Sequence, residues 1–370
     1  MRLEPLIAKK FEMKGSEKSR QSLLDDYMKF LRRQKPLPLF LLFLIILTIG
    51  EGVGMGLASY FHKPLSGLET FQMMIPATAA FLVFRILAGQ TQPFPKYVCR
   101  AFFAADILFL IAVVLESVLL PVSLSQTVSP ILVLTGIVFF DLALFLEPAE
   151  TKDAYGMLCK TKIKTILFYL FLFLILQAGN YFIQTVFDYF SGNRHAFLDF
   201  IELYSHFPSA LLRLPFFFLC VFLPYFGEEY GWRGFLQPRM QKQFGMKKGL
   251  ILTGMIWGVW HLPLYLFRYP SSTLLQELLH QIACCVLIGI FMGYVYLKTK
   301  NIWICTAIHF LNNAMIGTLF PSVAESAPSS SLEDQAIGIL AIFLVYGFFI
   351  GSRVFREKKI LEDLLLPRTR

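Results

Sequence analysis

An adjacent pair of carboxylates follows a long apolar run in this chain of 370 residues. Glu228 and Glu229 begin the stretch "EEYGWR", which ends at Arg233. On a helix, Glu229 and Arg233 lie on one face, and Glu precedes Arg, which is the favourable order for an ion pair. Glu228 points about 100° away, and we expect it to have no partner in the same segment. One carboxylate is therefore predicted to be structural and the other to be available for chemistry. The alternative is that both cap the end of a helix.

Two further stretches place histidines inside apolar sequence. "WGVWH" puts His261 one helical turn after Trp257, and "HFLNN" puts His309 four residues before Asn313. The period of a helix places the members of each pair on one face. Pro263 follows His261 closely and removes a backbone donor, so the helix is expected to open beside the histidine.

A carboxylate, two imidazoles and a carboxamide suit the hydrolysis of a peptide bond. A carboxylate and an imidazole can together hold and deprotonate a water molecule. Imidazole and amide N–H groups can stabilise the oxyanion that forms when water attacks an amide. The sequence has no HExxH motif and no obvious three-ligand spacing, so a tightly held zinc ion is not predicted.

The elements that position these residues are predicted to be membrane helices. The chain is 56% hydrophobic and 16% charged, whereas soluble domains are about 45–50% apolar and about 25% charged. Runs such as Leu37–Gly50 and Thr165–Gly179 are continuously apolar and lack the alternation of a membrane β-barrel. The predicted fold class is all-α, a polytopic transmembrane helical bundle with its active-site domain in the C-terminal half.

Ten candidate spans each approach the ~20 residues that a bilayer requires. They lie roughly at 38–60, 71–89, 101–120, 128–146, 165–187, 208–227, 249–268, 277–297, 302–320 and 336–352. Lysine and arginine concentrate in the even-numbered loops and in both terminal segments. Under the positive-inside rule, this pattern predicts an integral multi-pass membrane protein with both termini in the cytoplasm. The formal charge of +9 is explained by the same pattern, so no nucleic-acid partner is predicted.

The span map also predicts the depth of the candidate residues in the bilayer. His261 lies about 18 Å and His309 about 11 Å from the cytoplasmic ends of their spans, at ~1.5 Å per residue. Glu228 lies at the cytoplasmic end of the sixth span. The three side chains are therefore expected to converge in the cytoplasmic half of the bilayer.

Taken in order, the three stretches resemble the motifs of a family of intramembrane proteases. This is the CAAX-protease and bacteriocin-processing family (CPBP, or Abi), which includes type II CAAX prenyl endopeptidases and lysostaphin-resistance-like proteins. Its motifs are EExxxR, an aromatic residue followed by three others and His, and HxxxN, which match 228–233, 257–261 and 309–313. Trp257 stands where Phe is commonest in the family. The first five spans fall outside the resemblance.

The resemblance implies an endopeptidase with a catalytic group and a supporting group. The catalytic group consists of Glu228 and His261, which would activate water, and of His309 and Asn313, which would form the oxyanion site. The supporting group consists of Glu229, Arg233 and Trp257. Members have been called metalloproteases, so zinc is a candidate cofactor by naming, but the spacing does not support it and the cofactor stays unassigned. The expected partners are a peptide or membrane-protein substrate and the lipid bilayer.

Four regions follow from the spans and the resemblance. They are a basic cytoplasmic arm at 1–36, N-terminal transmembrane helices of unassigned role at 37–206, a CAAX-protease-like catalytic domain at 207–320, and a last span with a basic cytoplasmic tail at 321–370.

Two other classes of protein stay open at this point. A transporter would use the isolated charges of the first five spans along a path, and these include Glu51, Arg85, Asp106 and Asp141. It would also predict inverted repeats, and none is visible. A membrane scaffold or immunity-type protein would keep the family fold and act by binding.

Overall fold

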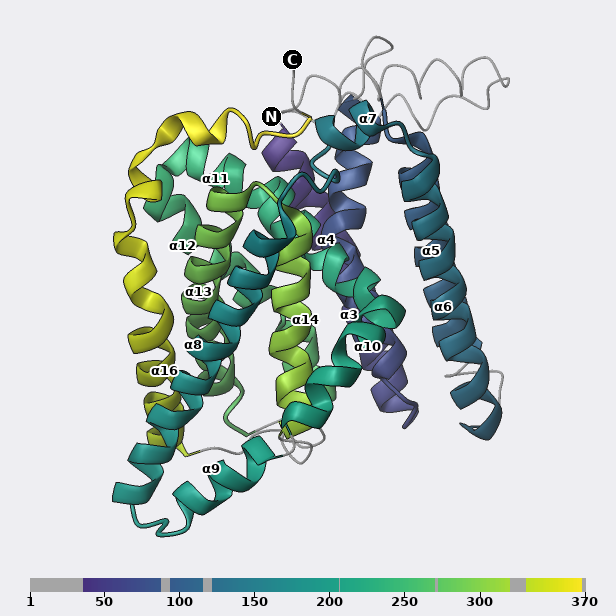
Figure 1. Cartoon of the computed structure of the whole chain (residues 1–370). Helices are drawn as coiled ribbons and strands as arrows, with labels where there is room; N and C mark the ends of the chain where they lie inside the picture. The colour runs from purple at the N-terminus through teal and green to yellow at the C-terminus, as the bar shows by residue number, and fades with distance from the viewer. Residues whose placement is uncertain are drawn as a thin grey trace, which may run out of the picture.

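The computed structural model describes residues 36–87, 94–115, 122–205, 207–269, 272–319 and 331–367. Within these ranges the regular structure is helical and contains no strand. The predicted all-α helical bundle is therefore confirmed (Figure 1). The predicted basic arm lies outside the described residues, apart from Pro36.

A helix of the described chain coincides with each of the ten predicted spans. These helices are α3 (Pro36–Tyr60), α4 (Ser66–Leu87), α5 (Lys96–Val114), α6 (Val122–Leu146), α8 (Ile163–Phe190), α10 (Phe207–Glu229), α12 (Met246–Trp260), α13 (Leu274–Thr299), α14 (Ile302–Leu319) and α16 (Leu332–Tyr346). Seven helical segments of the described chain are long and apolar enough to cross a membrane. Helices α6, α10 and α14 are not among those seven, so the expected count of ten spans is not confirmed.

Shorter helical segments connect and extend these helices. They are α7 (Ala149–Ala154), α9 (Ala196–Ser205), the π-helix η2 (Tyr230–Leu236), α11 (Gln237–Phe244), the π-helix η3 (Leu264–Arg268), and the 3₁₀ segments η4 (Gly347–Gly351), η5 (Arg353–Arg356) and η6 (Lys358–Leu361).

The basic connections and the C-terminal segment gather at one end of the bundle. Helices α7 and α11 lie there beside the start of α3 and the last described residues, whereas α9 lies at the opposite end (Figure 1). Lys300, between α13 and α14, forms an ion pair with Asp363. Arg239 in α11 donates a hydrogen bond to the carbonyl of Leu366. This grouping is the one that the alternation of basic loops predicts, and its placement in the cytoplasm stays a prediction.

The helical segment formed by α10 and η2 approaches α4 closely through one glycine in each element. A Cβ atom at Gly227 would lie 2.7 Å from the carbonyl oxygen of Met73, and one at Gly231 would lie 2.2 Å from Cβ of Pro76. Small residues allow helix backbones to meet at this range. The contact holds the end of α10 and the start of η2, which carry the two carboxylates, against the N-terminal half of the chain.

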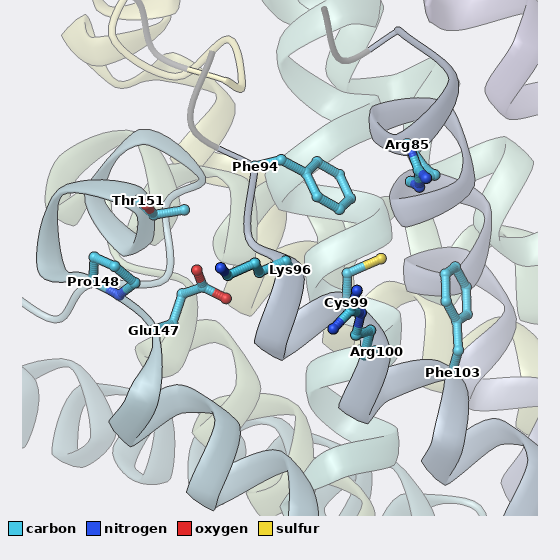
Figure 2. Close-up of a pocket in the computed structure, with 9 residues that line it drawn as sticks. All are labelled: Arg85, Phe94, Lys96, Cys99, Arg100, Phe103, Glu147, Pro148 and Thr151. Carbon is cyan, nitrogen blue, oxygen red and sulfur yellow. The ribbon is translucent and has the colours of Figure 1, made fainter. Parts of the chain in front are cut away.

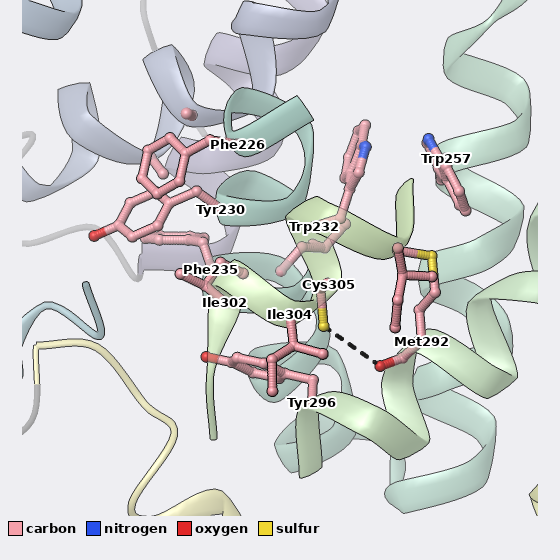
Figure 3. Packing of buried hydrophobic residues seen from close by; sticks show 14 of the residues in the cluster. Phe226, Tyr230, Trp232, Phe235, Trp257, Met292, Tyr296, Ile302, Ile304 and Cys305 are labelled. Carbon is pink, nitrogen blue, oxygen red and sulfur yellow. Dashed lines mark hydrogen bonds between the residues drawn. The ribbon is translucent and has the colours of Figure 1, made fainter. Parts of the chain in front are cut away.

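Helix α12 is seated on α13 in the same way. A Cβ atom at Gly254 would lie 2.7 Å from Cα of Val286, and one at Gly258 would lie 2.5 Å from Cα of Ile282. Aromatic and aliphatic side chains of α10, η2, α13 and α14 fill the space between these helix pairs (Figure 3). The interior packing therefore fixes the rotation of the helices that carry the three motifs.

Candidate active site

The two carboxylates lie inside the bundle, and not at the end of a helical segment. Glu228 and Glu229 are the last residues of α10, but the chain continues through η2 and α11 to Phe244. Glu228 is 3% exposed and Glu229 is fully buried. Glu228 lies one residue before the end of α10, and its depth in the bilayer stays a prediction. The side chains that follow in η2 are also buried.

The helix is a π-helix directly after the two carboxylates. Every residue of η2, from Tyr230 to Leu236, is buried. Single π-turns within α-helices are uncommon and are frequent at functional sites, because they change the direction of side chains relative to a regular helix. Here the π-turns carry Trp232 and Arg233, which contact the two carboxylates.

Glu228 accepts two hydrogen bonds from indole N–H groups. Nε1 of Trp232 lies 3.0 Å and Nε1 of Trp257 lies 2.7 Å from Oε2 of Glu228. The expectation that Glu228 has no partner in its own segment is therefore wrong, because Trp232 is four residues further along the same helix. Both indoles bind the same oxygen, and no hydrogen bond within the described chain engages Oε1.

Glu229 forms the predicted ion pair with Arg233. Nη1 of Arg233 lies 3.0 Å from Oε1 of Glu229, and the two side chains are 2% and 0% exposed. Nδ1 of His309 lies 2.8 Å from the same oxygen. A carboxylate oxygen only accepts, so Nδ1 of His309 is the donor. Because an isolated buried charge is costly, the guanidinium is required to compensate the carboxylate.

Trp257 joins all three motifs. Besides its hydrogen bond to Glu228, its ring lies 4.3 Å from the guanidinium carbon of Arg233. The same ring meets that of His309 edge-on, with centroids 5.6 Å apart, and that of His261 at 6.1 Å. One side chain of α12 therefore contacts residues of α10, η2 and α14.

His261 lies in the turn that ends α12. The α-helix stops at Trp260, in agreement with the predicted opening of the helix before Pro263. Nδ1 of His261 lies 2.8 Å from the carbonyl oxygen of Trp257. A carbonyl oxygen only accepts, so Nδ1 carries the proton, and Nε2 of the neutral ring presents its lone pair. The imidazole is half-buried and interacts electrostatically with Glu228 and His309.

Asn313 is less closely tied to the other predicted residues. It lies on α14 one turn beyond His309 and is half-buried. Its Oδ1 accepts a hydrogen bond from Nδ2 of Asn312 at 3.1 Å. The structure thus brings Glu228, His261 and His309 together around Trp257, and within the described residues no hydrogen bond connects Asn313 to them.

Three residues that contact this centre were missed in the sequence. Trp232 lies four residues after Glu228, and the same spacing predicted the ion pair between Glu229 and Arg233. Gln72 in α4 donates to the carbonyl of Trp260 at 2.9 Å, and Tyr225 stacks edge-on against His309 at 5.5 Å. Gln72 belongs to α4, so this N-terminal helix is bound to the last turn of α12, directly before His261.

The side chains of this centre do not fit a metal ion. In the ranges that the structure describes, no group of three or more His, Cys, Asp or Glu side chains is placed to hold a metal. We therefore derive no step that passes through zinc.

The isolated charges of the first five spans occupy different surroundings. Asp106 is buried and accepts a hydrogen bond from Thr78 at 2.7 Å, whereas Asp141 is exposed on the outer face of α6. Glu51 is buried in α3. Arg85 is exposed in the last turn of α4, so its position in the membrane stays a prediction.

Comparison with known proteins supports the resemblance drawn from the motifs. Residues 210–315 match the family model described as type II CAAX prenyl endopeptidase Rce1-like. A stretch of 92 residues, 23% of this chain, is 32% identical to CAAX prenyl protease 2 of Methanococcus maripaludis. The chain spans 34% of the length of that curated relative. The predicted resemblance to the CAAX-protease family is thus confirmed for this region, which contains all three motifs.

Proposed function

We propose that the region at 207–320 is an intramembrane endopeptidase of the CAAX-protease type. The observation that carries this proposal is the meeting of Glu228, His261 and His309 around the ring of Trp257. These residues come from three helices and from the three motifs, and they supply a base and hydrogen-bond donors in a buried place. A scaffold that acts only by binding gives no reason for such an arrangement.

In the proposed reaction, water is the nucleophile and no covalent enzyme intermediate forms. The carboxylate of Glu228 accepts a proton from a water molecule that is also held by Nε2 of His261. The water oxygen forms a bond to the carbonyl carbon of the substrate, and the π electrons of the carbonyl move to its oxygen. The C–N bond then breaks, and the proton on Glu228 passes to the leaving amine.

The two indoles are proposed to orient the base. They hold Oε2 of Glu228 from two sides, so that Oε1 is the oxygen that faces the water. The donor from Trp257 also couples the position of the carboxylate to the helix that carries His261. A base held in one orientation loses less entropy when the reaction begins.

His309 and Asn313 are proposed to stabilise the oxyanion. Nδ1 of His309 is bound to Glu229, so Nε2 is the nitrogen that can point at the substrate and must carry a proton to donate. Asn313 is one turn further along α14 and would add its amide N–H₂ when a substrate is bound. In this arrangement Glu229 and Arg233 do not touch the substrate, and they position His309.

The matching family and relative suggest a substrate with a prenylated C-terminal CAAX motif. The test is to reconstitute the purified chain in lipid vesicles and to add a peptide that ends in a farnesylated CAAX motif. We expect cleavage after the modified cysteine, detected by mass spectrometry, and slower cleavage of the unmodified peptide. Cleavage of a transmembrane-peptide library alone would indicate a different membrane-peptide substrate. If a folded protein cleaved neither, the protease proposal would give way to a binding role.

A further inference from the structure

A second candidate site lies at the basic end of the bundle, between α4, α5 and α7. A cavity of about 580 Å³ opens there (Figure 2), and ligand pockets commonly measure about 300–1,000 Å³. The residues that line it are Arg85, Phe94, Lys96, Cys99, Arg100, Phe103, Glu147, Pro148 and Thr151. None of these residues belongs to the proposed active site.

Three cations face this cavity from two helices. Arg85 is in the last turn of α4, and Lys96 and Arg100 are in the first two turns of α5. All three side chains are exposed. Within the described part of the chain, none of them forms an ion pair with an acidic side chain. Their charges are therefore available to a ligand.

The one carboxylate in the wall is already engaged by the backbone. Oε2 of Glu147 accepts hydrogen bonds from the backbone N–H groups of Tyr97 at 2.8 Å and Val98 at 3.1 Å. Glu147 thereby satisfies donors in the first turn of α5, which would otherwise lack partners. With three cations and one acid, the lining keeps an excess of two positive charges.

The cavity lies at the ends of the apolar helices α4 and α5, where helices that cross a bilayer would meet the headgroup region. Arg85 precedes the end of α4 at Leu87 by two residues, Lys96 is the first residue of α5, and Glu147 directly follows α6. Phe94 and Phe103 add apolar wall beside the cations. Basic pockets between membrane helices at this level attract anionic headgroups.

We propose that this cavity binds a phosphate group, carried by an anionic lipid headgroup or by a soluble phosphate compound. Arg85 and Arg100 offer planar guanidinium groups, which bind phosphate oxygens in pairs, and Lys96 adds a third positive charge. The aromatic side chains contact the less polar part of the ligand. This site is independent of the proteolytic activity proposed above.

The test compares lipid binding to the full-length chain and to two triple variants. The protein in detergent is titrated with dioleoyl phosphatidylglycerol, or with dioleoyl phosphatidylcholine as a net-neutral reference, and bound lipid is counted by native mass spectrometry. The first variant carries Arg85→Gln, Lys96→Gln and Arg100→Gln. The control removes the same charge from the same end of the bundle, at the exposed residues Lys242, Lys247 and Lys248, each replaced by Gln.

We expect the cavity variant to lose at least ~10-fold in affinity for phosphatidylglycerol, because each cation near a membrane surface adds to the attraction. The control should change less than ~2-fold if the cavity, and not the overall charge, is responsible. A parallel calorimetric titration with inorganic phosphate distinguishes a lipid headgroup from a soluble phosphate compound as the ligand. Binding of inorganic phosphate that depends on the three cations would assign the cavity to a soluble compound, and lipid binding alone would assign it to a headgroup.

The proposal is overturned if both triple variants lose affinity equally, or if neither phosphate nor phosphatidylglycerol binds. All six substituted side chains are exposed, so we expect both variants to fold. Equal thermal unfolding midpoints for the two variants check this. A cleavage assay on the same samples tests the peptidase proposal independently of phosphate binding.

Discussion

The indole of Trp257 contributes to the site what a phenylalanine ring cannot. Its ring contacts His309 and Arg233, and its N–H donates to Glu228 at 2.7 Å. Phenylalanine at this position would keep the ring contacts and lose the donor. In this chain the orientation of the proposed base therefore depends on two tryptophans, Trp232 and Trp257.

Trp257→Phe is expected to lower kcat by about 10-fold with a smaller effect on KM, because a hydrogen bond to a charged group contributes about 1.5–3 kcal/mol. Steady-state cleavage kinetics measure the change. Trp303→Phe is the matched control, since Nε1 of Trp303 donates to the backbone carbonyl of Met157 at 2.8 Å. If both variants lost turnover equally, the effect would be one of general packing.

Arg233→Ala is expected to destabilise the protein by about 3–5 kcal/mol, because it leaves the buried carboxylate of Glu229 without its guanidinium. Thermal unfolding in detergent measures the loss. Arg268→Ala is the control, because it breaks a partly exposed ion pair with Glu69, and such pairs contribute about 0–1 kcal/mol. An Arg233 variant with normal stability and lost turnover would move Arg233 into the catalytic group.

At the scale of residues, the sequence could predict pairs within one helical turn but not pairs between helices. The spacing of Glu229 and Arg233 was sufficient to identify their ion pair. Glu228 and Trp257 are 29 positions apart, and Glu229 and His309 are 80 apart. Those contacts depend on the rotation of α12 and α14, which the interior packing determines. Trp232 has the same four-residue spacing from Glu228, but a pattern of opposite charges does not identify its uncharged indole donor.

At the scale of elements, the contact between η2 and α4 sets the position of both carboxylates. Gly231 lies where a Cβ would meet backbone and side-chain atoms of Pro76 at 2.2–2.7 Å. The two elements cannot approach this closely with a larger residue at that position. The N-terminal half of the chain, which carries none of the three motifs, is thereby coupled to the site.

Gly231→Ala is expected to lower stability by about 1–3 kcal/mol, since α4 and η2 must move apart to make room for the methyl group. Cleavage should fall as well, because the carboxylates move with η2. Gly179→Ala in α8 is the control, as its Cβ meets nothing within 4 Å, and alanine there should be neutral or stabilising by up to ~1 kcal/mol. Thermal unfolding of the Gly231→Ala and Gly179→Ala variants checks this prediction. Equal midpoints would contradict the claim that the contact between η2 and α4 requires glycine.

The positions of the helices followed from the apolar runs, because a backbone in lipid must satisfy its own hydrogen bonds. The π-helical turns of η2 and η3 were not predictable in this way. They depend on side chains packed from other helices, and a pattern of apolar residues does not distinguish an extra residue in one turn. The predicted span at 208–227 therefore matches α10, whereas the apolar pattern did not indicate that the next segment is a π-helix.

At the scale of the whole molecule, the basic connections lie at one end of the bundle and α9 lies at the other (Figure 1). Lys242 in α11 and Lys359 in η6 belong to the basic end, and Asn193 precedes α9. The positive-inside rule then predicts that Lys242 and Lys359 face the cytoplasm and that Asn193 faces the other side.

Single cysteines at these three positions test the orientation in intact cells. Those at Lys242 and Lys359 should resist a membrane-impermeant thiol reagent until the membrane is opened, and that at Asn193 should react at once. A cysteine introduced at Lys14, which lies outside the described residues, should be protected like the one at Lys359 if both termini are cytoplasmic. If the cysteines introduced at positions 359 and 193 reacted from the same side of the membrane, the predicted orientation would be contradicted.

The central claim is that Glu228 is the base and that Glu229 is a positioning residue. The most direct measurement is the single-turnover rate of peptide cleavage by Glu228→Gln and Glu229→Gln, each with its thermal unfolding midpoint. Glutamine at 228 keeps an acceptor for both indoles but cannot take up the proton. We predict a loss of at least ~10²-fold with normal stability for Glu228→Gln, and loss of stability before loss of turnover for Glu229→Gln. Wild-type cleavage by Glu228→Gln, with a folded and inactive Glu229→Gln, would contradict the account.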